Sequence, residues 1–99
     1  MYKVKITVLN KLKNPEALRE FGNDLEEECP FFKVGQEFIS ENVQKPEGFC
    51  NWAWADIHKD VAILTFGGNV PWIRREGTII SCCTNGLRPV VFKIERIEK

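Results

Sequence analysis

Residues 51–67 read NWAWADIHKDVAILTFG, and this stretch decides the fold. Its apolar residues recur at spacings of three and four, the period of one face of an α-helix, at Trp54, Ile57, Val61 and Leu64. Asn51 is the expected cap and Gly67 the expected stop, so the pattern predicts a helix over residues 52–66. Other apolar residues widen the stripe. We therefore expect this helix to be covered on more than one side, by the domain or by a partner subunit.

Strand patterns flank this helix in the sequence. Residues 2–9 alternate apolar and polar side chains, and residues 36–40 form a second short run. Residues 77–84 and 87–97 are two apolar runs separated by Asn85-Gly86. Because both residues of a tight hairpin turn take positive φ, Asn-Gly predicts a two-residue β-hairpin at this point.

A shorter helix is expected between the first two strands. It starts at Asn14-Pro15, since asparagine is a good cap and proline at the first helical position loses no hydrogen bond. The residues that follow at helical spacing on one face are Leu18, Phe21 and Leu25. The glycine at position 22 ends or breaks the pattern.

The order of these elements is strand, helix, strand, helix, strand, strand, which predicts an α+β fold. We expect one two-layer domain over residues 1–99, with a four-stranded mixed sheet, a C-terminal β-hairpin and the helices on one face. The alternative is a small half-barrel with helices, because neither face of the expected hairpin is clearly polar.

Composition limits the function classes. The 99 residues carry 14 basic and 14 acidic side chains, so the net charge is zero. A neutral chain lacks the basic excess typical of nucleic-acid binding, and it does not repel its own copies. No apolar run reaches the about 18–20 residues of a membrane span, and no apolar signal region follows the N-terminus. We therefore expect a cytoplasmic protein with reduced thiols, no nucleic-acid or membrane partner, and no cofactor.

The four cysteines stand at positions 29, 50, 82 and 83 and lack the paired spacing of a zinc site, so no metal is expected. Three interpretations remain open: the cysteines are small buried hydrophobes, reactive or metal-binding thiols at Cys50 or Cys83, or regulatory disulfides. Neighbouring residues of a strand point to opposite faces, which separates Cys82 from Cys83. In the expected hairpin register, Cys83 shares a face with Ile79, Ser81, Val90 and Phe92. The distances among the sulfurs of Cys29, Cys50 and Cys83 distinguish a shared site from separate core positions.

A candidate ligand pocket gathers the rarer side chains of the chain, namely Cys50, Trp52, Trp54, His58, Trp72 and Cys83. Cys50 comes just before the expected helix cap, where the positive end of the helix dipole favours a thiolate. The tryptophans line a pocket for an apolar or planar ligand, belong to the core, or form a dimer surface. Asp56 and Asp60 share one side of the helix with Lys59, and we expect that side to be solvated.

Several motifs are similar to those of a known family. They are KVKITVL at residues 3–9, Cys29-Pro30, GQEF at residues 35–38, PEGFCNWA at residues 46–53 and CCTNGLRPVVF at residues 82–92. Together they resemble an uncharacterised family of small bacterial and archaeal conserved hypothetical proteins of similar length, marked by a GFCxWA motif and a C-terminal CCTxGLRPVVF hairpin. The resemblance covers nearly the whole chain and implies a stand-alone prokaryotic cytoplasmic protein. It implies no catalytic residues.

Two functions follow from these residues. The first is a small soluble non-enzymatic domain that binds a partner or a small-molecule ligand through its aromatic-rich half and self-associates as a homodimer. The alternative is a thiol-dependent enzyme or a metal-binding protein that uses Cys50 and Cys83, with His58 or Asp56 nearby.

Overall fold

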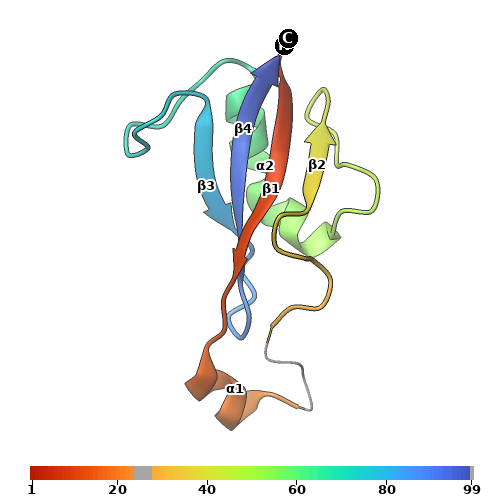
Figure 1. The fold of residues 1–99 in the computed structure, drawn as a ribbon, viewed down its shortest axis with the longest axis vertical. Helices are drawn as coiled ribbons and strands as arrows, with labels where there is room; N and C mark the ends of the chain where they lie inside the picture. Colours follow the sequence, from red (N-terminus) through yellow and green to blue (C-terminus); the bar gives the residue numbers. More distant parts are fainter. Residues whose placement is uncertain (24–27, 99) are drawn as a thin grey trace.

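The computed structural model describes residues 1–23 and 28–98. These described residues form four strands and two helices in the predicted order, and Figure 1 shows their arrangement. Their bounds are β1 (Lys3–Lys11), α1 (Pro15–Phe21), β2 (Glu37–Ser40), α2 (Asn51–Thr65), β3 (Thr78–Cys82) and β4 (Val90–Glu98). The prediction of an α+β fold is confirmed.

The four strands form one open sheet in the order β2-β1-β4-β3, and every pair of neighbours is antiparallel. The prediction of a mixed sheet is therefore wrong. A helical crossover usually brings its two strands together as parallel neighbours. Here α2 connects β2 to β3, and these strands lie at opposite edges of the sheet, so no parallel pair forms. The half-barrel alternative does not describe this open sheet.

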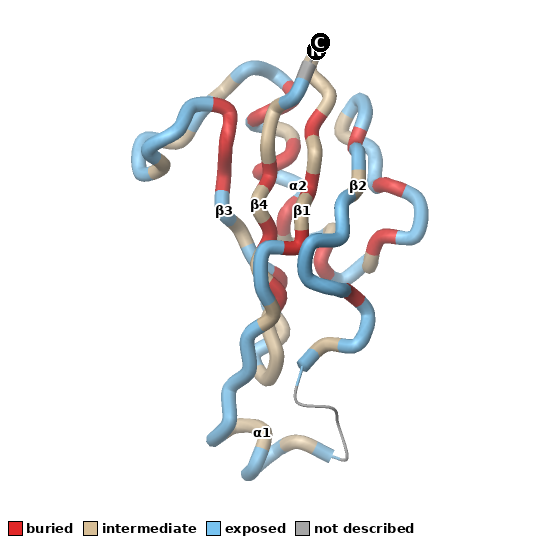
Figure 2. Tube along the Cα trace, viewed as in Figure 1, coloured by how far each residue is buried: buried red, intermediate tan, exposed pale blue. Residues whose placement is uncertain are grey.

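The core lies between the sheet and α2. Figure 1 shows α2 behind the sheet, and Figure 2 shows the buried positions alternating along β1. Val4, Ile6 and Val8 of β1 are at most 1% exposed. The predicted stripe of α2 supplies the other side of the core with Ile57, Val61 and Leu64, all fully buried. Burial of these faces explains why the sequence periods of two and 3.6 predicted the strand and the helix correctly.

The two ends of α2 differ from each other in how well the sequence predicted them. The N-cap is Cys50 and not Asn51, which is already helical. At the other end Gly67 takes φ +88° and donates to the carbonyl of Leu64 at 3.1 Å, while the amide of Gly68 donates to Ile63 at 2.8 Å. These two bonds form a Schellman motif, in which glycine is favoured because it takes a left-handed conformation without steric cost.

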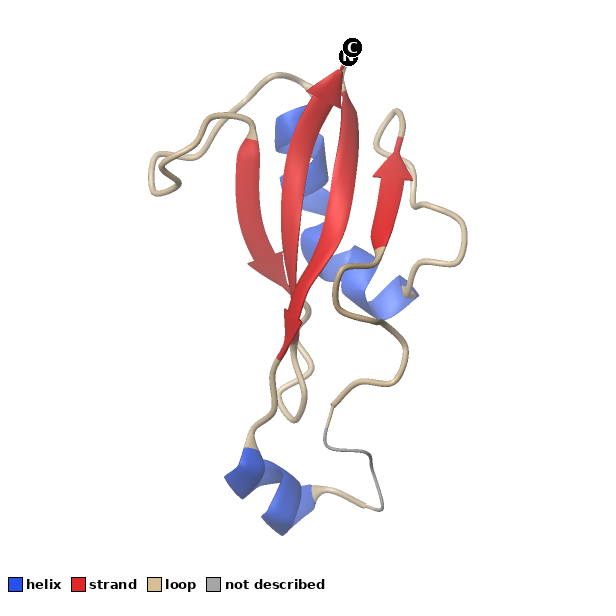
Figure 3. Ribbon diagram, viewed as in Figure 1, coloured by secondary structure: helices blue, strands red, loops and turns tan. Residues whose placement is uncertain are grey.

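α1 does not lie on the sheet face. It buries no side chain, and Figure 3 shows it beyond the end of β1, away from α2. The expectation that both helices cover one face is therefore corrected, since only α2 does so. The predicted start is right, because the Asn14 side chain accepts from the amide of Ala17 at 3.3 Å. The position of Leu25, predicted on the same helix face, lies outside the described residues.

The C-terminal hairpin has a longer loop than predicted. Cys82 pairs with Val91, which moves the register by two residues from that of a tight Asn85-Gly86 turn. Neither Asn85 nor Gly86 is among the described residues with positive φ, so the predicted turn type is wrong. Instead, the Asn85 side chain accepts from the amide of Leu87 at 3.0 Å. A shift of two residues keeps the faces unchanged, so Cys83 still shares the inner face with Ile79, Ser81, Val90 and Phe92.

Candidate functional site

Three of the four cysteines line one pocket of about 380 Å³. Its walls come from three segments that are distant in the sequence. They are the loop before β2, the N-terminal turn of α2, and the hairpin loop that follows β3. The lining residues are Cys29, Phe32, Cys50, Trp52, Ala53, Cys83, Thr84, Asn85, Gly86 and Arg88.

Cys50 lies where the pocket meets α2. It is the N-cap residue, its side chain makes no capping hydrogen bond, and it is partly buried. Its carbonyl accepts the first helical bond, from the amide of Trp54 at 2.9 Å. The thiol therefore lies beside helix N–H groups without satisfying them, at the end of α2 where the dipole is positive.

The two adjacent cysteines lie on opposite faces of the sheet, as predicted. Cys83 is 7% exposed and lines the pocket, and its Sγ accepts from the amide of Val90 at 3.3 Å. Cys82 is exposed on the face that α2 does not cover. The interpretation of the cysteines as buried hydrophobes therefore fits Cys83, is wrong for Cys82, and fits Cys29 and Cys50 only in part.

The wall formed by the loop before β2 is held in place by a lysine of β1. Lys11 is largely buried, and its Nζ donates to the carbonyl of Cys29 at 3.2 Å and to that of Phe32 at 2.9 Å. The same ammonium group lies 4.0 Å from a carboxylate oxygen of Glu28. Because these bonds join the loop to the sheet, they keep the Cys29 segment over the pocket.

Asp56 joins the helix to the hairpin loop beside the pocket. Its carboxylate accepts from the Thr84 amide at 2.7 Å and from the Thr84 hydroxyl at 3.0 Å. The expected solvated side of α2 is therefore only partly solvated. Asp60, one turn further on, is 8% exposed and lies 3.3 Å from the ammonium of Lys59.

Replacing Asp56 by alanine is expected to lower the free energy of unfolding by about 1–2 kcal/mol, because it leaves the Thr84 amide and hydroxyl without their acceptor. Urea unfolding measures this change. Thr84→Ala, which removes the hydroxyl but keeps the amide bond to Asp56, should cost less. An equal cost for both variants would contradict the role assigned to the carboxylate.

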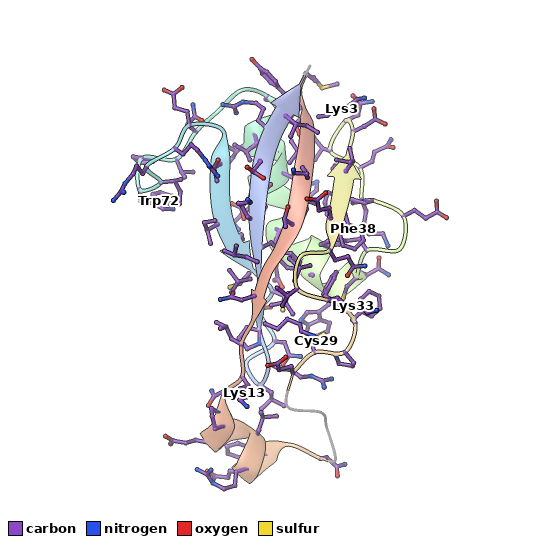
Figure 4. The ribbon with its side chains drawn as sticks, viewed as in Figure 1. Lys3, Lys13, Cys29, Lys33, Phe38 and Trp72 are labelled. Atoms are coloured by element: carbon purple, nitrogen blue, oxygen red, sulfur yellow. The ribbon has the colours of Figure 1, made fainter. Side chains whose placement is uncertain are left out.

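The structure brings together three of the six residues predicted for the candidate pocket, namely Cys50, Trp52 and Cys83. The ring of Trp54 packs on Phe49 at 6.1 Å and on His58 at 5.4 Å, and neither Trp54 nor His58 lines the pocket. Figure 4 shows Trp72 on the loop beside β3, distant from Cys29 along the molecule.

The sequence did not identify several residues of the pocket walls. Phe32, Ala53 and Arg88 line it, and so do the hairpin residues Thr84, Asn85 and Gly86. Cys29 was not predicted as a pocket residue. It was named only because the distance of its sulfur from those of Cys50 and Cys83 would distinguish a shared site from separate positions. The hairpin residues were assigned to strands and a tight turn, so they were not predicted to line a pocket.

The described part of the chain offers no metal site, because no group of three or more His, Cys, Asp or Glu side chains within it could hold an ion. Within residues 1–23 and 28–98, neither helix is long and apolar enough to span a bilayer.

The fold and the pocket together define a class of protein: a small two-layer α+β domain with a pocket lined by thiols at the N-terminus of its main helix. Neither a protein-family model, nor a curated protein, nor a solved structure matches the chain. The function must therefore be argued from the pocket itself.

Proposed function

We propose that this protein is a binding domain for a small molecule with a planar, apolar body, held in the pocket at the N-terminus of α2. The observation that carries the proposal is the pocket of about 380 Å³. Pockets for small ligands measure about 300–1,000 Å³ and combine mostly apolar walls with a few polar groups. Phe32, Ala53 and Trp52 supply apolar surface, and the three thiols add soft, weakly polar surface.

The polar groups of the walls favour a ligand with an acidic group. Among the described lining residues, Arg88 alone carries a formal charge, while Thr84 and Asn85 add uncharged hydrogen-bonding groups. A guanidinium pairs well with a carboxylate or sulfonate. The indole of Trp52 is 67% exposed, so a planar ligand has an aromatic face available for stacking.

Binding of 8-anilinonaphthalene-1-sulfonate, an aromatic sulfonate, tests this proposal by fluorescence titration. Trp52→Ala is expected to weaken binding about three- to tenfold, because it removes a stacking surface. Trp72→Ala is the matched control, since Trp72 is similarly exposed, at 74%, but lies outside the pocket walls. Equal effects of the two substitutions would contradict binding in this pocket.

A second candidate function is a thiol-dependent activity, which is the alternative that we predicted from the sequence. The observation that favours it is that Cys29, Cys50 and Cys83 line the same pocket. A ligand bound there would contact thiols, one of them at a helix N-terminus. Alkylation of the native protein with iodoacetamide at neutral pH, mapped by peptide mass, tests this candidate, and slow reaction of all three pocket cysteines would contradict it.

Self-association and a cytoplasmic location complete the proposal, together with membership of the bacterial and archaeal family that the sequence resembles. Support for a homodimer comes from the outer side of α2, where Ile63 is 37% and Phe66 69% exposed, and from zero net charge. Sedimentation velocity at micromolar concentration tests the homodimer, and a monomer alone would contradict it.

A further inference from the structure

We propose that Cys50 and Cys29 form a redox pair. Cys50 reacts with a low-molecular-weight disulfide, Cys29 resolves the adduct, and the resulting disulfide bridge closes the pocket. The effect of the bridge on ligand binding rests on the proposed function of the pocket. The inference starts from a juxtaposition that the sequence alone does not show. The two thiols lie 21 positions apart in the sequence, on a loop and on a helix end, and they line the same pocket.

Cys50 is the attacking thiol because of its surroundings. It is the N-cap of α2, so its sulfur lies at the end of the helix where backbone N–H groups have no partner within the helix. Arg88, the one charged residue among the described lining residues, belongs to the same pocket. The side chain is partly exposed and makes no capping hydrogen bond, so a small disulfide that enters the pocket can reach its sulfur.

Cys29 is the resolving thiol because the other two cysteines are unsuited. Cys83 is 7% exposed, and its sulfur accepts a hydrogen bond from Val90. Cys82 lies on the opposite face of the sheet, away from the pocket. Cys29 is partly exposed and belongs to a segment outside the helices and strands, so its sulfur can approach Cys50 without unpairing a strand. Lys11 holds the carbonyl of Cys29 over the pocket.

The chemistry is two steps of thiol–disulfide exchange with oxidised glutathione as the oxidant. In the first step the Cys50 thiolate attacks one sulfur of oxidised glutathione. Its S–S bond breaks, a protein–glutathione disulfide forms, and a glutathione thiolate leaves. In the second step the Cys29 thiolate attacks the Cys50 sulfur and displaces the second glutathione thiolate. The two thiolates that leave take up the protons lost by Cys50 and Cys29. The protein loses two electrons and two protons, and one disulfide becomes two thiols.

Treatment of the full chain with oxidised glutathione, followed by intact mass measurement and peptide mapping, tests the pair. The wild type should lose the mass of two hydrogens, retain no glutathione, and yield one crosslinked Cys29–Cys50 peptide. Cys29→Ser should retain one glutathione on Cys50. Cys50→Ser should react at least about tenfold more slowly than the wild type, since it lacks the attacking thiol. Cys82→Ser is the matched control and should behave as the wild type.

Three outcomes would overturn the pair: a bridge that maps to Cys82 or Cys83, no reaction of the wild type, or equal oxidation rates in Cys50→Ser and the wild type. The wild-type map decides the matter even if a variant fails to fold. Titration with 8-anilinonaphthalene-1-sulfonate separates this proposal from the proposed function. Oxidation should weaken binding, and dithiothreitol should restore it. If the protein binds the probe but oxidised glutathione does not oxidise it, only the redox pair is excluded. If the bridge forms but the protein never binds the probe, only the ligand function is excluded.

Discussion

Replacing Phe32 by alanine is expected to lower the free energy of unfolding by about 3–5 kcal/mol, the usual cost of removing a buried aromatic ring. Phe32 is 2% exposed although it lies in a loop. Its ring centroid lies 5.2 Å from those of Phe49 and Phe92 and 5.9 Å from that of Phe38. These rings join the loop, β2, β4 and the segment that leads into α2, so the substitution opens a cavity at their common contact.

Urea unfolding monitored by far-UV circular dichroism measures this loss. Phe31→Ala is the matched control, because Phe31 is the preceding residue in the same loop but is 56% exposed. We expect it to cost less than about 1 kcal/mol, as surface substitutions usually do. A similar loss for both variants would contradict the placement of Phe32 in the core.

Replacing Arg96 by methionine is expected to lower the free energy of unfolding by about 2–3 kcal/mol, because hydrogen bonds of a charged group are lost. Nη1 of Arg96 donates to the carbonyls of Leu64 at 3.2 Å and Gly68 at 2.7 Å. Nη2 donates to the Asn69 side chain at 3.0 Å, and the guanidinium lies 5.0 Å from the centre of the Tyr2 ring. The cation therefore caps the negative end of α2 from β4.

Thermal unfolding at two salt concentrations tests this cap. Methionine keeps most of the apolar stem of Arg96, so the loss reports the guanidinium. Arg74→Met is the control, since Arg74 is exposed, and it should change stability by less than about 0.5 kcal/mol. The cap assignment would be wrong if Arg96→Met were as stable as the wild type.

Local patterns predicted the elements whose side chains are buried on one face. β1 alternates and α2 repeats every three to four residues because each packs one side against the same core. The stop of α2 was also predictable, since a glycine with positive φ leaves a local sequence signal. These features depend on residues that are near one another in the chain.

Features that depend on distant segments were not predictable. Asn85-Gly86 forms no tight turn, and the hairpin loop instead bonds to the segment after β1: the amide of Leu12 donates to the carbonyl of Pro89 at 2.8 Å and that of Asn14 to the carbonyl of Leu87 at 2.9 Å. The place of Cys29 in the pocket depends on Lys11, which lies 18 positions earlier and holds its carbonyl. The antiparallel order depends on the connection through α2, which places β3 at the opposite edge of the sheet from β2. No local period encodes such contacts.

The most direct test of the central claim is a ¹H–¹⁵N correlation spectrum of the reduced protein during titration with 8-anilinonaphthalene-1-sulfonate. The three indole N–H signals report on three different surroundings. We predict that the Trp52 signal and the amides of Cys50, Ala53 and Gly86 shift together, while the Trp72 signal stays unchanged. Shifts confined to Trp72, or to strand residues on the face that α2 leaves open, would contradict a ligand site in the thiol-lined pocket, and so would a spectrum that does not change.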